Sequence, residues 1–218
     1  MSELEVTPKK KVSKIKKLPA IVCDYDDTIV SFTGGICKLY NKRHNTAISD
    51  SDIKDWDFIT VDTKDARGNI VKGADLMATF KEYESNGLYV GLRLLDKAKD
   101  ALNLMYRLGY KIIIVTARDE KFGKDTELSL IFRDIAQYVD QVHFTTDKVK
   151  KIQELSKSYK ICLFVDDKAS TCQSVAENCK VDHVCLVEKA HNVSVEMTED
   201  VKRVKDLFDT IRYLKDVN

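Results

Sequence analysis

Short apolar runs that stop abruptly at a polar residue are the feature that most constrains the fold of this chain. Three of these runs, each with the polar residue that follows or ends it, are 20–23 with Asp24, 110–115 with Thr116, and 161–165 with Asp166. Continuous apolar runs of this length are typical of strands that are buried on both faces of a parallel sheet. The sequence therefore predicts a buried sheet whose strands end at polar loops.

Apolar residues between these runs recur at helical spacing, which predicts helices between the strands. The predicted helices cover about 92–108, 128–139, 149–155, 171–179 and 199–214, and two further strands cover 142–144 and 184–187. In the second helix, the residues at this spacing are Leu128, Ile131, Ile135 and Val139. Strands that alternate with helices indicate an α/β fold, a parallel sheet with helices on both faces.

Residues 31–91 interrupt this alternation. They are more polar than the rest of the chain and contain its one tryptophan, Trp56. We interpret them as a small, partly helical cap that is inserted after the first strand, and caps of this kind exclude water and select substrates. The predicted organisation is a flexible lysine-rich tail over 1–17, an α/β core formed by 18–30 and 92–218, and the cap over 31–91.

The charge balance argues against a long polyanion as the main partner. The 218 residues include 36 Lys and Arg against 35 Asp and Glu, for a net charge of +1. Residues 1–17 contain six lysines and two acids, so the rest of the chain has 30 basic and 33 acidic residues, a net charge of −3. A body of that sign lacks the basic footprint of a nucleic-acid-binding protein.

The composition also predicts the compartment. No stretch approaches the ~18 consecutive apolar residues of a membrane helix, and the N-terminus lacks the apolar core of a secretory signal. The six cysteines form no Cys-x-x-Cys pair, and three of them lie in short apolar runs. We therefore expect a cytoplasmic protein with reduced thiols and no membrane partner.

Acidic residues gather where the predicted strands end. They are Asp24, Asp26, Asp166 and Asp167. Because the carboxyl ends of parallel strands meet at one edge of the sheet, we expect these carboxylates to lie together, where ligands of α/β proteins bind. Clustered carboxylates without histidine or thiolate partners prefer a hard cation such as Mg²⁺, for which phosphate is a natural co-ligand.

Four segments, taken in order, resemble the motifs of haloacid-dehalogenase-like phosphatases. They are Asp24-Tyr25-Asp26-Asp27-Thr28, 112–116, Lys148, and Val165-Asp166-Asp167. The resemblance spans about residues 20–187 and implies a Rossmann-like parallel sheet with a cap after the first strand. Within that superfamily, Phe32 and the segments 52–58, 144–149 and 165–168 are similar to the corresponding parts of 5′(3′)-deoxyribonucleotidases.

This resemblance implies roles for individual residues. Asp24 would attack phosphorus and form an aspartyl-phosphate. Asp26 would protonate the leaving oxygen and then deprotonate the water that hydrolyses the intermediate. Thr116 would hold phosphoryl oxygens, and Lys148 would offset the negative charge gathered at the site.

The resemblance also implies a magnesium ligand set. Asp24, the backbone carbonyl of Asp26, and either Asp166 or Asp167 would bind Mg²⁺. The residues themselves do not distinguish which member of the Asp166-Asp167 pair is the direct ligand.

The predicted substrate contacts are Phe32, Thr116, Ala117, Arg118 and Lys148. The deoxyribonucleotidase family commonly has Ser-Pro where this chain has Ala117-Arg118, and Gly-Val where it has 27–28. Arg118 would then meet an additional phosphate or a different edge of the substrate.

Each of these residues also has a structural interpretation. Lys148 is followed by Lys150 and Lys151, so the three could form one solvated helix face; its position just after a strand favours Lys148. Phe32 and the other aromatic residues of 31–91 could form a small core of their own.

The preferred function is a Mg²⁺-dependent phosphomonoesterase that acts on nucleoside monophosphates, with deoxyribonucleotides favoured. One alternative keeps the chemistry but acts on the 3′-phosphate end of a nucleic acid, a partner that the net charge of the body disfavours. The other alternative is a non-catalytic binding protein that retains the fold.

Overall fold

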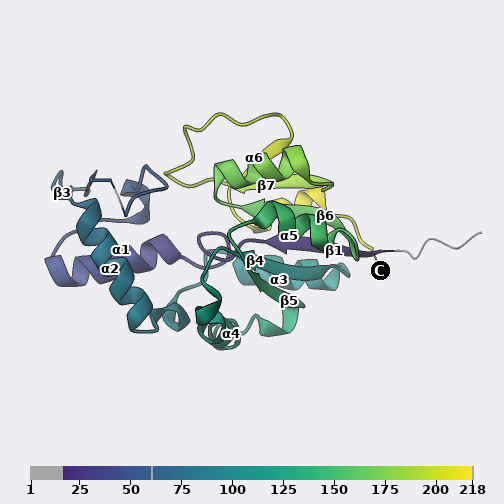
Figure 1. The fold of residues 1–218 in the computed structure, drawn as a ribbon, viewed down its shortest axis with the longest axis horizontal. Coiled ribbons are helices and arrows are strands. Elements are labelled where there is room, and N and C mark those ends of the chain that lie inside the picture. The colour runs from purple at the N-terminus through teal and green to yellow at the C-terminus, as the bar shows by residue number, and fades with distance from the viewer. Residues whose placement is uncertain (1–16, 60, 218) are drawn as a thin grey trace, which may run out of the picture.

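The computed structural model describes residues 17–59 and 61–217, and a sheet of six parallel strands forms its centre (Figure 1). The strands are β1 (Leu18–Cys23), β4 (Lys111–Thr116), β5 (Gln141–Phe144), β6 (Tyr159–Asp166), β7 (His183–Val187) and β8 (Val201–Val204). Their order is β5-β4-β1-β6-β7-β8. The chain therefore starts in the middle, builds one half of the sheet, and returns to build the other half. The predicted α/β fold is confirmed.

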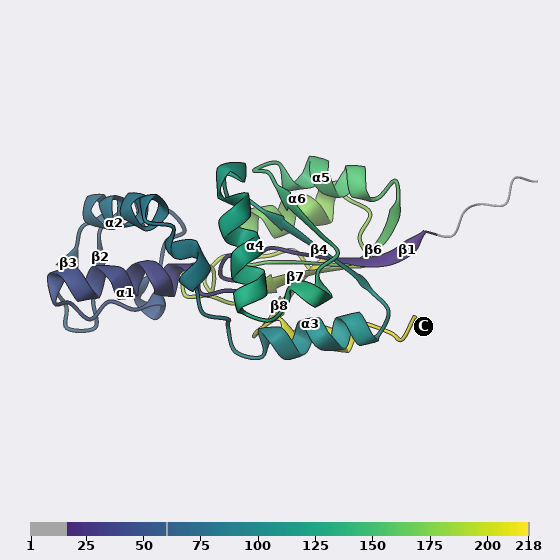
Figure 2. The ribbon, with the colours of Figure 1, turned by 90° about the horizontal axis from the view of Figure 1, so that it is seen from below.

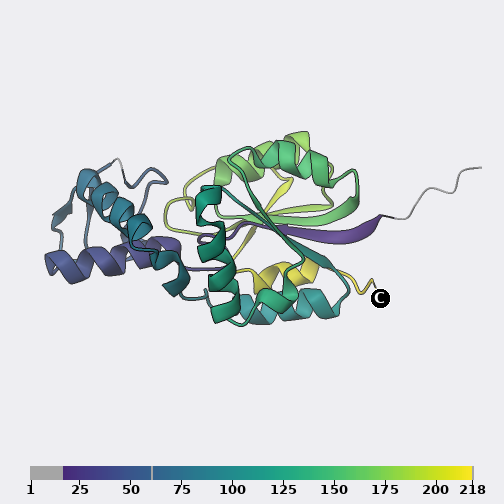
Figure 3. The ribbon, with the colours of Figure 1, turned by 60° about the horizontal axis from the view of Figure 1, so that its bottom comes forward.

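Helices cover both faces of this sheet (Figure 3). On one face, α3 (Ala98–Arg107) packs with the 3-10 turn η5 (Phe208–Tyr213), and on the other, α5 (Lys148–Leu155) packs with α6 (Ala169–Asn178). Alternate side chains of a strand pack into two separate cores. Ile112 and Ile114 of β4 belong to the core under α3, whereas Ile113 belongs to the core under α5 and α6. Burial on both faces explains why the strands read as continuous apolar runs.

The register of the two central strands fixes where their polar ends meet. Ala20 pairs with Ile161 and Ile21 pairs with Leu163, so Cys162 is an extra residue in β6. Beyond this irregularity Cys23 lies opposite Val165, and the backbone N–H of Asp24 donates to the Val165 carbonyl at 2.9 Å. The residues after β1 and at the end of β6 are thereby held side by side.

Residues 31–59 and 61–91 lie beyond the carboxyl ends of the strands, as Figure 2 shows. Their elements are α1 (Phe32–His44), η1 (Asp50–Asp52), the two-stranded ladder of β2 (Thr63–Lys64) and β3 (Ile70–Val71), α2 (Gly73–Ser85) and η2 (Leu88–Gly91). We call this segment the insertion. Its outgoing and returning connections run side by side, because Ser31 N–H donates to the Arg93 carbonyl and Leu95 N–H donates to the Ile29 carbonyl, both at 2.9 Å.

The helix predicted over 199–214 is wrong. The chain forms β8 there and then η5. The three-residue spacing of Val201 and Val204 fits a helix, but in a strand it places the two side chains on opposite faces, and they pack in different cores. The open edge of β7 supplies hydrogen-bond partners for this segment, which the local pattern does not reveal.

Two predicted helices have other bounds than expected, one beginning later and one lying earlier in the chain. The helix predicted over 92–108 begins only at Ala98. The helix predicted over 128–139 is α4 (Gly123–Phe132), and Asp134 follows it with a positive φ of 53°. Leu128 and Ile131 are exposed rather than buried, and the buried apolar residue of α4 is Leu130.

All six cysteines carry free thiols, and five of them are buried. Burial raises the pKa of Cys23 and of Cys185, which keeps these thiols protonated. No helix in the described residues is long and apolar enough to span a membrane. The predicted lysine-rich tail lies outside the described residues, apart from Lys17.

The burial pattern of α4 predicts opposite outcomes for two adjacent residues. Leu130→Ala should lower the free energy of unfolding by about 2–5 kcal/mol, because its side chain is 4% exposed and packs in the core. Ile131→Ala should change it by less than about 0.5 kcal/mol, because Ile131 is 65% exposed. Urea titration of both variants checks this pair, and a larger loss for Ile131→Ala would contradict the observed orientation of α4.

Candidate active site

The candidate site lies where the direction of sheet building reverses, between β1 and β6. Ligands of doubly wound sheets bind at this position. Asp24 follows β1, Asp166 ends β6, and Asp167 comes next; their side chains are buried. Carboxylate oxygens of the three lie within 4.8 Å of one another. The structure thus brings together three of the four acids that the sequence places at strand ends.

One lysine neutralises part of this charge. Lys148 is the first residue of α5, whose N-cap, Asp147, accepts a hydrogen bond from the backbone N–H of Lys150. The Lys148 Nζ donates to Asp24 Oδ1 at 2.5 Å and to Asp166 Oδ2 at 2.7 Å. Lys150 is exposed, and Lys151 pairs with Glu154 on the surface. Lys148 is therefore the lysine of this run that reaches the carboxylates.

Burial and repulsion between the carboxylates both raise the pKa of Asp24 and of Asp167, and Lys148 opposes both effects. Burial raises the pKa of Asp24, and Lys148 opposes this rise while Asp166 and Asp167 add to it. Burial also raises the pKa of Asp167, and the nearby Asp27 and Asp166 carboxylates raise it further. The pKa of Lys148 is raised as well, because its attraction to Asp166 and Asp24 outweighs its own burial. Three carboxyl groups of the cluster thus share a single lysine.

The arrangement fits a divalent cation. Both carboxylate oxygens of Asp167 are buried without a hydrogen-bond partner among the described residues. The His191 Nε2 lies 3.2 Å from Asp167 Oδ2, and burial lowers the pKa of that histidine, which favours its uncharged form. Buried carboxylates that lack a partner are costly, and an all-oxygen set of this kind suits Mg²⁺. Asp24, Asp166 and Asp167 are the side chains able to bind it.

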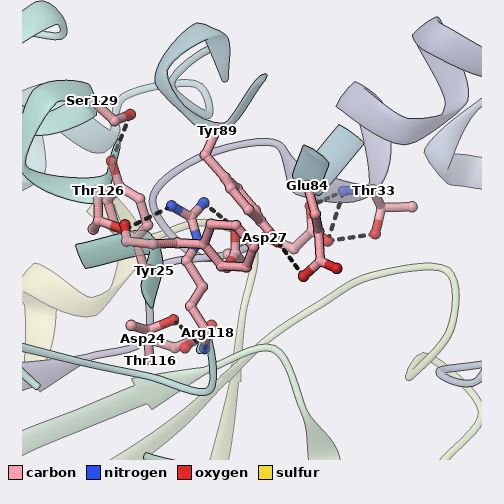
Figure 4. Close-up of polar contacts among 12 residues, drawn as sticks. Asp24, Tyr25, Asp27, Thr33, Glu84, Tyr89, Thr116, Arg118, Thr126 and Ser129 are labelled. Atoms are coloured by element: carbon pink, nitrogen blue, oxygen red, sulfur yellow. Dashed lines mark hydrogen bonds and ion pairs between the residues drawn. The ribbon is translucent and has the colours of Figure 1, made fainter. Parts of the chain in front are cut away.

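The Asp26 side chain has a different partner, Arg118. The Arg118 Nε donates to Asp26 Oδ2 at 2.7 Å, and Nη2 donates to Oδ1 at 2.6 Å. The remaining terminal nitrogen, Nη1, donates to the Thr126 Oγ1 at 3.1 Å. The guanidinium also lies between two rings, with its carbon 4.6 Å from the Tyr25 centroid and 4.3 Å from that of Tyr89 (Figure 4).

Two further predicted site residues, Thr116 and Ala117, lie where β4 ends. Thr116, the last residue of β4, is buried, and its Oγ1 accepts a hydrogen bond from the backbone N–H of Arg118 at 3.3 Å. Ala117, between them, is exposed. Both line the cavity described next.

A cavity of about 480 Å³ lies between the strand ends and the insertion. Asp24, Asp166 and Lys148 line it on the side of the sheet, and aromatic residues line it on the side of the insertion, among them Phe32, Trp56, Phe58 and Phe80. Phe32 both lines the cavity and packs on other rings, edge-on to Phe80 at 5.8 Å and stacked with Tyr89 at 6.1 Å. Phe32 therefore packs among the aromatic residues of the insertion and also faces the cavity, and its contact with a substrate stays a prediction.

Trp56 reaches across the cavity from the insertion to the α/β core. Its ring lies edge-on to His191 with centroids 5.1 Å apart, and the Lys168 Nζ lies 4.9 Å from its centroid. Trp56 is 41% exposed, so it forms part of the cavity wall without belonging to a packed core. Neither Lys168 nor Trp56 is among the predicted substrate contacts.

The turn after β1 depends on residues to which the sequence analysis assigns no role. Asp27 has a positive φ of 53°, and its carboxylate accepts hydrogen bonds from the Thr33 backbone N–H at 3.1 Å and from its hydroxyl at 2.5 Å. Tyr25 is fully buried and donates to Ser129 Oγ at 3.0 Å. These contacts fix the loop that carries Asp24 and Asp26.

Comparison with known proteins supports the assignment of the fold. No protein-family model matches the chain, and no curated protein sequence matches it. Among solved structures, a haloacid dehalogenase-like hydrolase from Streptococcus pneumoniae superposes with a TM-score of 0.60 at 13% identity, covering 90% of this chain and 98% of that chain.

Two further solved structures show the same likeness. A predicted phosphoglycolate phosphatase from Haemophilus somnus has a TM-score of 0.61 at 14% identity, covering 91% of this chain and 99% of that chain. A magnesium-bound haloacid dehalogenase-like (HAD) hydrolase from Bacillus subtilis has a TM-score of 0.56 at 12% identity, covering 90% of this chain and 98% of that chain. The chain therefore has the fold of the haloacid dehalogenase-like hydrolases.

Proposed function

We propose that this protein is a Mg²⁺-dependent phosphomonoesterase that hydrolyses nucleoside monophosphates through an aspartyl-phosphate. The observation that carries the proposal is the buried cluster of Asp24, Asp166 and Asp167 around Lys148, at the base of a cavity with aromatic walls. Three acids and one lysine at the switch point of a doubly wound sheet suit a phosphate dianion bound together with a divalent cation.

The nucleophile in this proposal is Asp24. Its carboxylate lies at the end of the central strand, lines the cavity, and is oriented by the 2.5 Å hydrogen bond from Lys148. One Asp24 oxygen attacks phosphorus as the bond from phosphorus to the ester oxygen breaks. Lys148 offsets the negative charge that collects when an anionic nucleophile approaches a phosphate dianion.

Asp26 serves as the acid and base. It supplies a proton to the departing ester oxygen and later takes one from the water that hydrolyses the aspartyl-phosphate. Thr116 and the backbone N–H groups of its loop hold the phosphoryl oxygens. Asp24, the Asp26 backbone carbonyl, and Asp166 or Asp167 would hold Mg²⁺, which when bound would supply Lewis-acid polarisation and orientation of the phosphate.

The wall of the cavity supports a nucleotide as the substrate. Aromatic rings bind nucleobases by stacking, a contact worth ~1–3 kcal/mol per base. Phe32, Phe80 and Trp56 offer such rings on the side of the cavity away from the carboxylates. We regard the insertion that carries them as a substrate-selecting cap. A cavity of about 480 Å³ suits a small molecule better than a nucleic-acid end.

A substrate panel tests the proposal. The full chain is assayed with ribo- and deoxyribonucleoside 5′- and 3′-monophosphates, with a 3′-phosphorylated oligonucleotide, and with p-nitrophenyl phosphate, each with Mg²⁺ and with EDTA. We expect the highest kcat/KM for a nucleoside monophosphate. A preference for the oligonucleotide would favour the nucleic-acid alternative, and absence of turnover throughout would favour the binding protein.

Replacing the nucleophile should abolish turnover. Asp24→Asn should lower kcat by about a thousandfold or more, because an amide cannot attack phosphorus. In the unmodified protein, beryllium fluoride should form an acyl-phosphate mimic on Asp24, which a crystal structure would locate. Substantial residual kcat in a variant whose melting temperature shows it to be folded would contradict this assignment.

Magnesium should stabilise the folded protein. A ligand that binds only the folded state raises stability by mass action, and here it also relieves repulsion among the buried carboxylates. We expect Mg²⁺ to raise the melting temperature measured by calorimetry, and EDTA to abolish turnover. Asp167→Asn should reduce this rise, whereas Asp134→Asn, an exposed acid that pairs with Lys99, should preserve it. An equal rise in both variants would exclude Asp167 as a ligand and leave Asp166 in that role.

Trp56 should affect substrate choice more than stability. Trp56→Ala should lower kcat/KM for a nucleoside monophosphate by about tenfold, as a stacking loss of ~1.4 kcal/mol implies, and should affect p-nitrophenyl phosphate less. The matched control is Tyr106→Ala, because Tyr106 is 52% exposed and lies outside the cavity. Equal losses for both substrates would remove Trp56 from the substrate wall.

A further inference from the structure

Arg118 borders the cavity, but each of its three side-chain nitrogens donates a hydrogen bond to another protein group. Its side chain is only 2% exposed. Three of its nitrogens donate hydrogen bonds to Asp26 and Thr126, and both faces of the guanidinium are covered by Tyr25 and Tyr89. An arginine that serves an additional substrate phosphate would present these donors to the cavity. Its contacts instead favour a role that acts through Asp26.

Asp26 depends on this arginine for its orientation. Among the described residues, both hydrogen bonds to its carboxylate come from Arg118, at 2.7 and 2.6 Å. A bidentate pair of this kind fixes the plane of a carboxylate as well as its position. Asp24 is held separately by Lys148. The two carboxylates that share one loop are thus oriented by two different cations.

The residues around Arg118 come from three parts of the chain. Tyr25 lies in the loop after β1, Thr126 lies on α4, and Tyr89 lies on η2, where the insertion returns to the α/β core. Tyr89 is buried and packs against Phe32, the first residue of α1. The position of the guanidinium is therefore coupled to the packing at both connections of the insertion.

We propose that Arg118 is a positioning residue that holds the Asp26 carboxyl group for proton transfer to the leaving oxygen, and that Tyr89 holds Arg118 in place from the insertion. This inference rests on the proposed phosphatase function. It assigns Arg118 a role through Asp26 in place of the predicted contact with substrate. It also makes the acid depend on a residue of the segment that closes over the cavity.

The pairing leaves Asp26 able to transfer a proton. A carboxylate has about four lone-pair sites, and two N–H donors occupy two of them. The remaining sites can carry the proton. In the first step the bond between phosphorus and the ester oxygen breaks, the bond to Asp24 forms, and the leaving oxygen takes the proton from Asp26. In the second step a water oxygen attacks phosphorus and its proton returns to Asp26. The bond between phosphorus and the Asp24 oxygen breaks, which frees the Asp24 carboxylate and inorganic phosphate.

A series of substituted phenyl phosphates tests this role, because its members share a shape and differ in how much their leaving oxygen needs a proton. The measured quantity is the slope of log kcat/KM against the leaving-group pKa, which reports phosphoryl transfer to Asp24. Loss of a general acid steepens this slope. We expect Arg118→Met to steepen it as Asp26→Asn does, so that phenyl phosphate loses about tenfold more than p-nitrophenyl phosphate.

Further variants separate positioning from loss of substrate contact or of stability. Arg118→Lys should give an intermediate slope, and Tyr89→Leu should steepen it more than Tyr89→Phe, which keeps the ring. Adding Arg118→Met to Asp26→Asn should steepen the slope no further. The matched control is Arg43→Met, because Arg43 also pairs with an acid, Glu82, but lies outside the cavity. If Arg118→Met does not fold, Arg118→Lys and the Tyr89 pair decide.

Parallel lines for the unmodified protein and the Arg118 variants mean the same loss of kcat/KM at every leaving group. This result would overturn the inference, assign Arg118 to substrate binding or to the fold, and leave the phosphatase function standing. An unmodified protein that hydrolyses neither aryl phosphates nor nucleotides would overturn the proposed function and this inference together.

Discussion

The contact of Lys148 with two buried carboxylates is the interaction on which the arrangement of this site depends. Asp24 and Asp166 lie where two adjacent central strands end, and both are almost wholly removed from water. Like charges about 4 Å apart cost about 4 kcal/mol at an effective dielectric constant of 20. The hydrogen bonds of 2.5 and 2.7 Å from one ammonium group compensate part of this repulsion. Asp167 lacks such a partner among the described residues, which leaves a position suited to a second cation.

The topology of the sheet makes that contact available. β1 starts in the middle, so its end lies beside β4 on one side and β6 on the other. The loop after β4 then supplies Arg118, and the start of α5, which follows β5, supplies Lys148. Each aspartate of the loop after β1 thus has its own cation. The two aspartates are two residues apart and still have different neighbours. This separation allows one of them to act as nucleophile and the other as acid and base in the proposed mechanism.

The sequence predicts the central strands better than it predicts the segments that pack at the periphery of the sheet. Strands buried on both faces, such as 161–165, can be identified from sequence because they form continuous apolar runs. The segment 199–214 does not, because its spacing fits a helix or a strand and the choice depends on the free edge of β7. α4 shows the same limit: Ile131 fits an apolar helix face, but the structure buries Leu130 instead. Local pattern describes a segment, whereas long-range pairing decides its orientation.

The same distinction between local pattern and long-range contacts applies to the residues of the candidate site. Asp24, Asp166 and Thr116 could be identified because each stands where an apolar run stops. Arg118 could be identified by position but not by its contacts, because Tyr25, Tyr89 and Thr126 are distant in sequence and meet only when the insertion packs against α4. A buried guanidinium between two rings is stable only if its charge is paired, and Asp26 provides that charge. The pairing of acid and arginine is therefore a product of tertiary packing, and it couples the loop after β1 to the insertion.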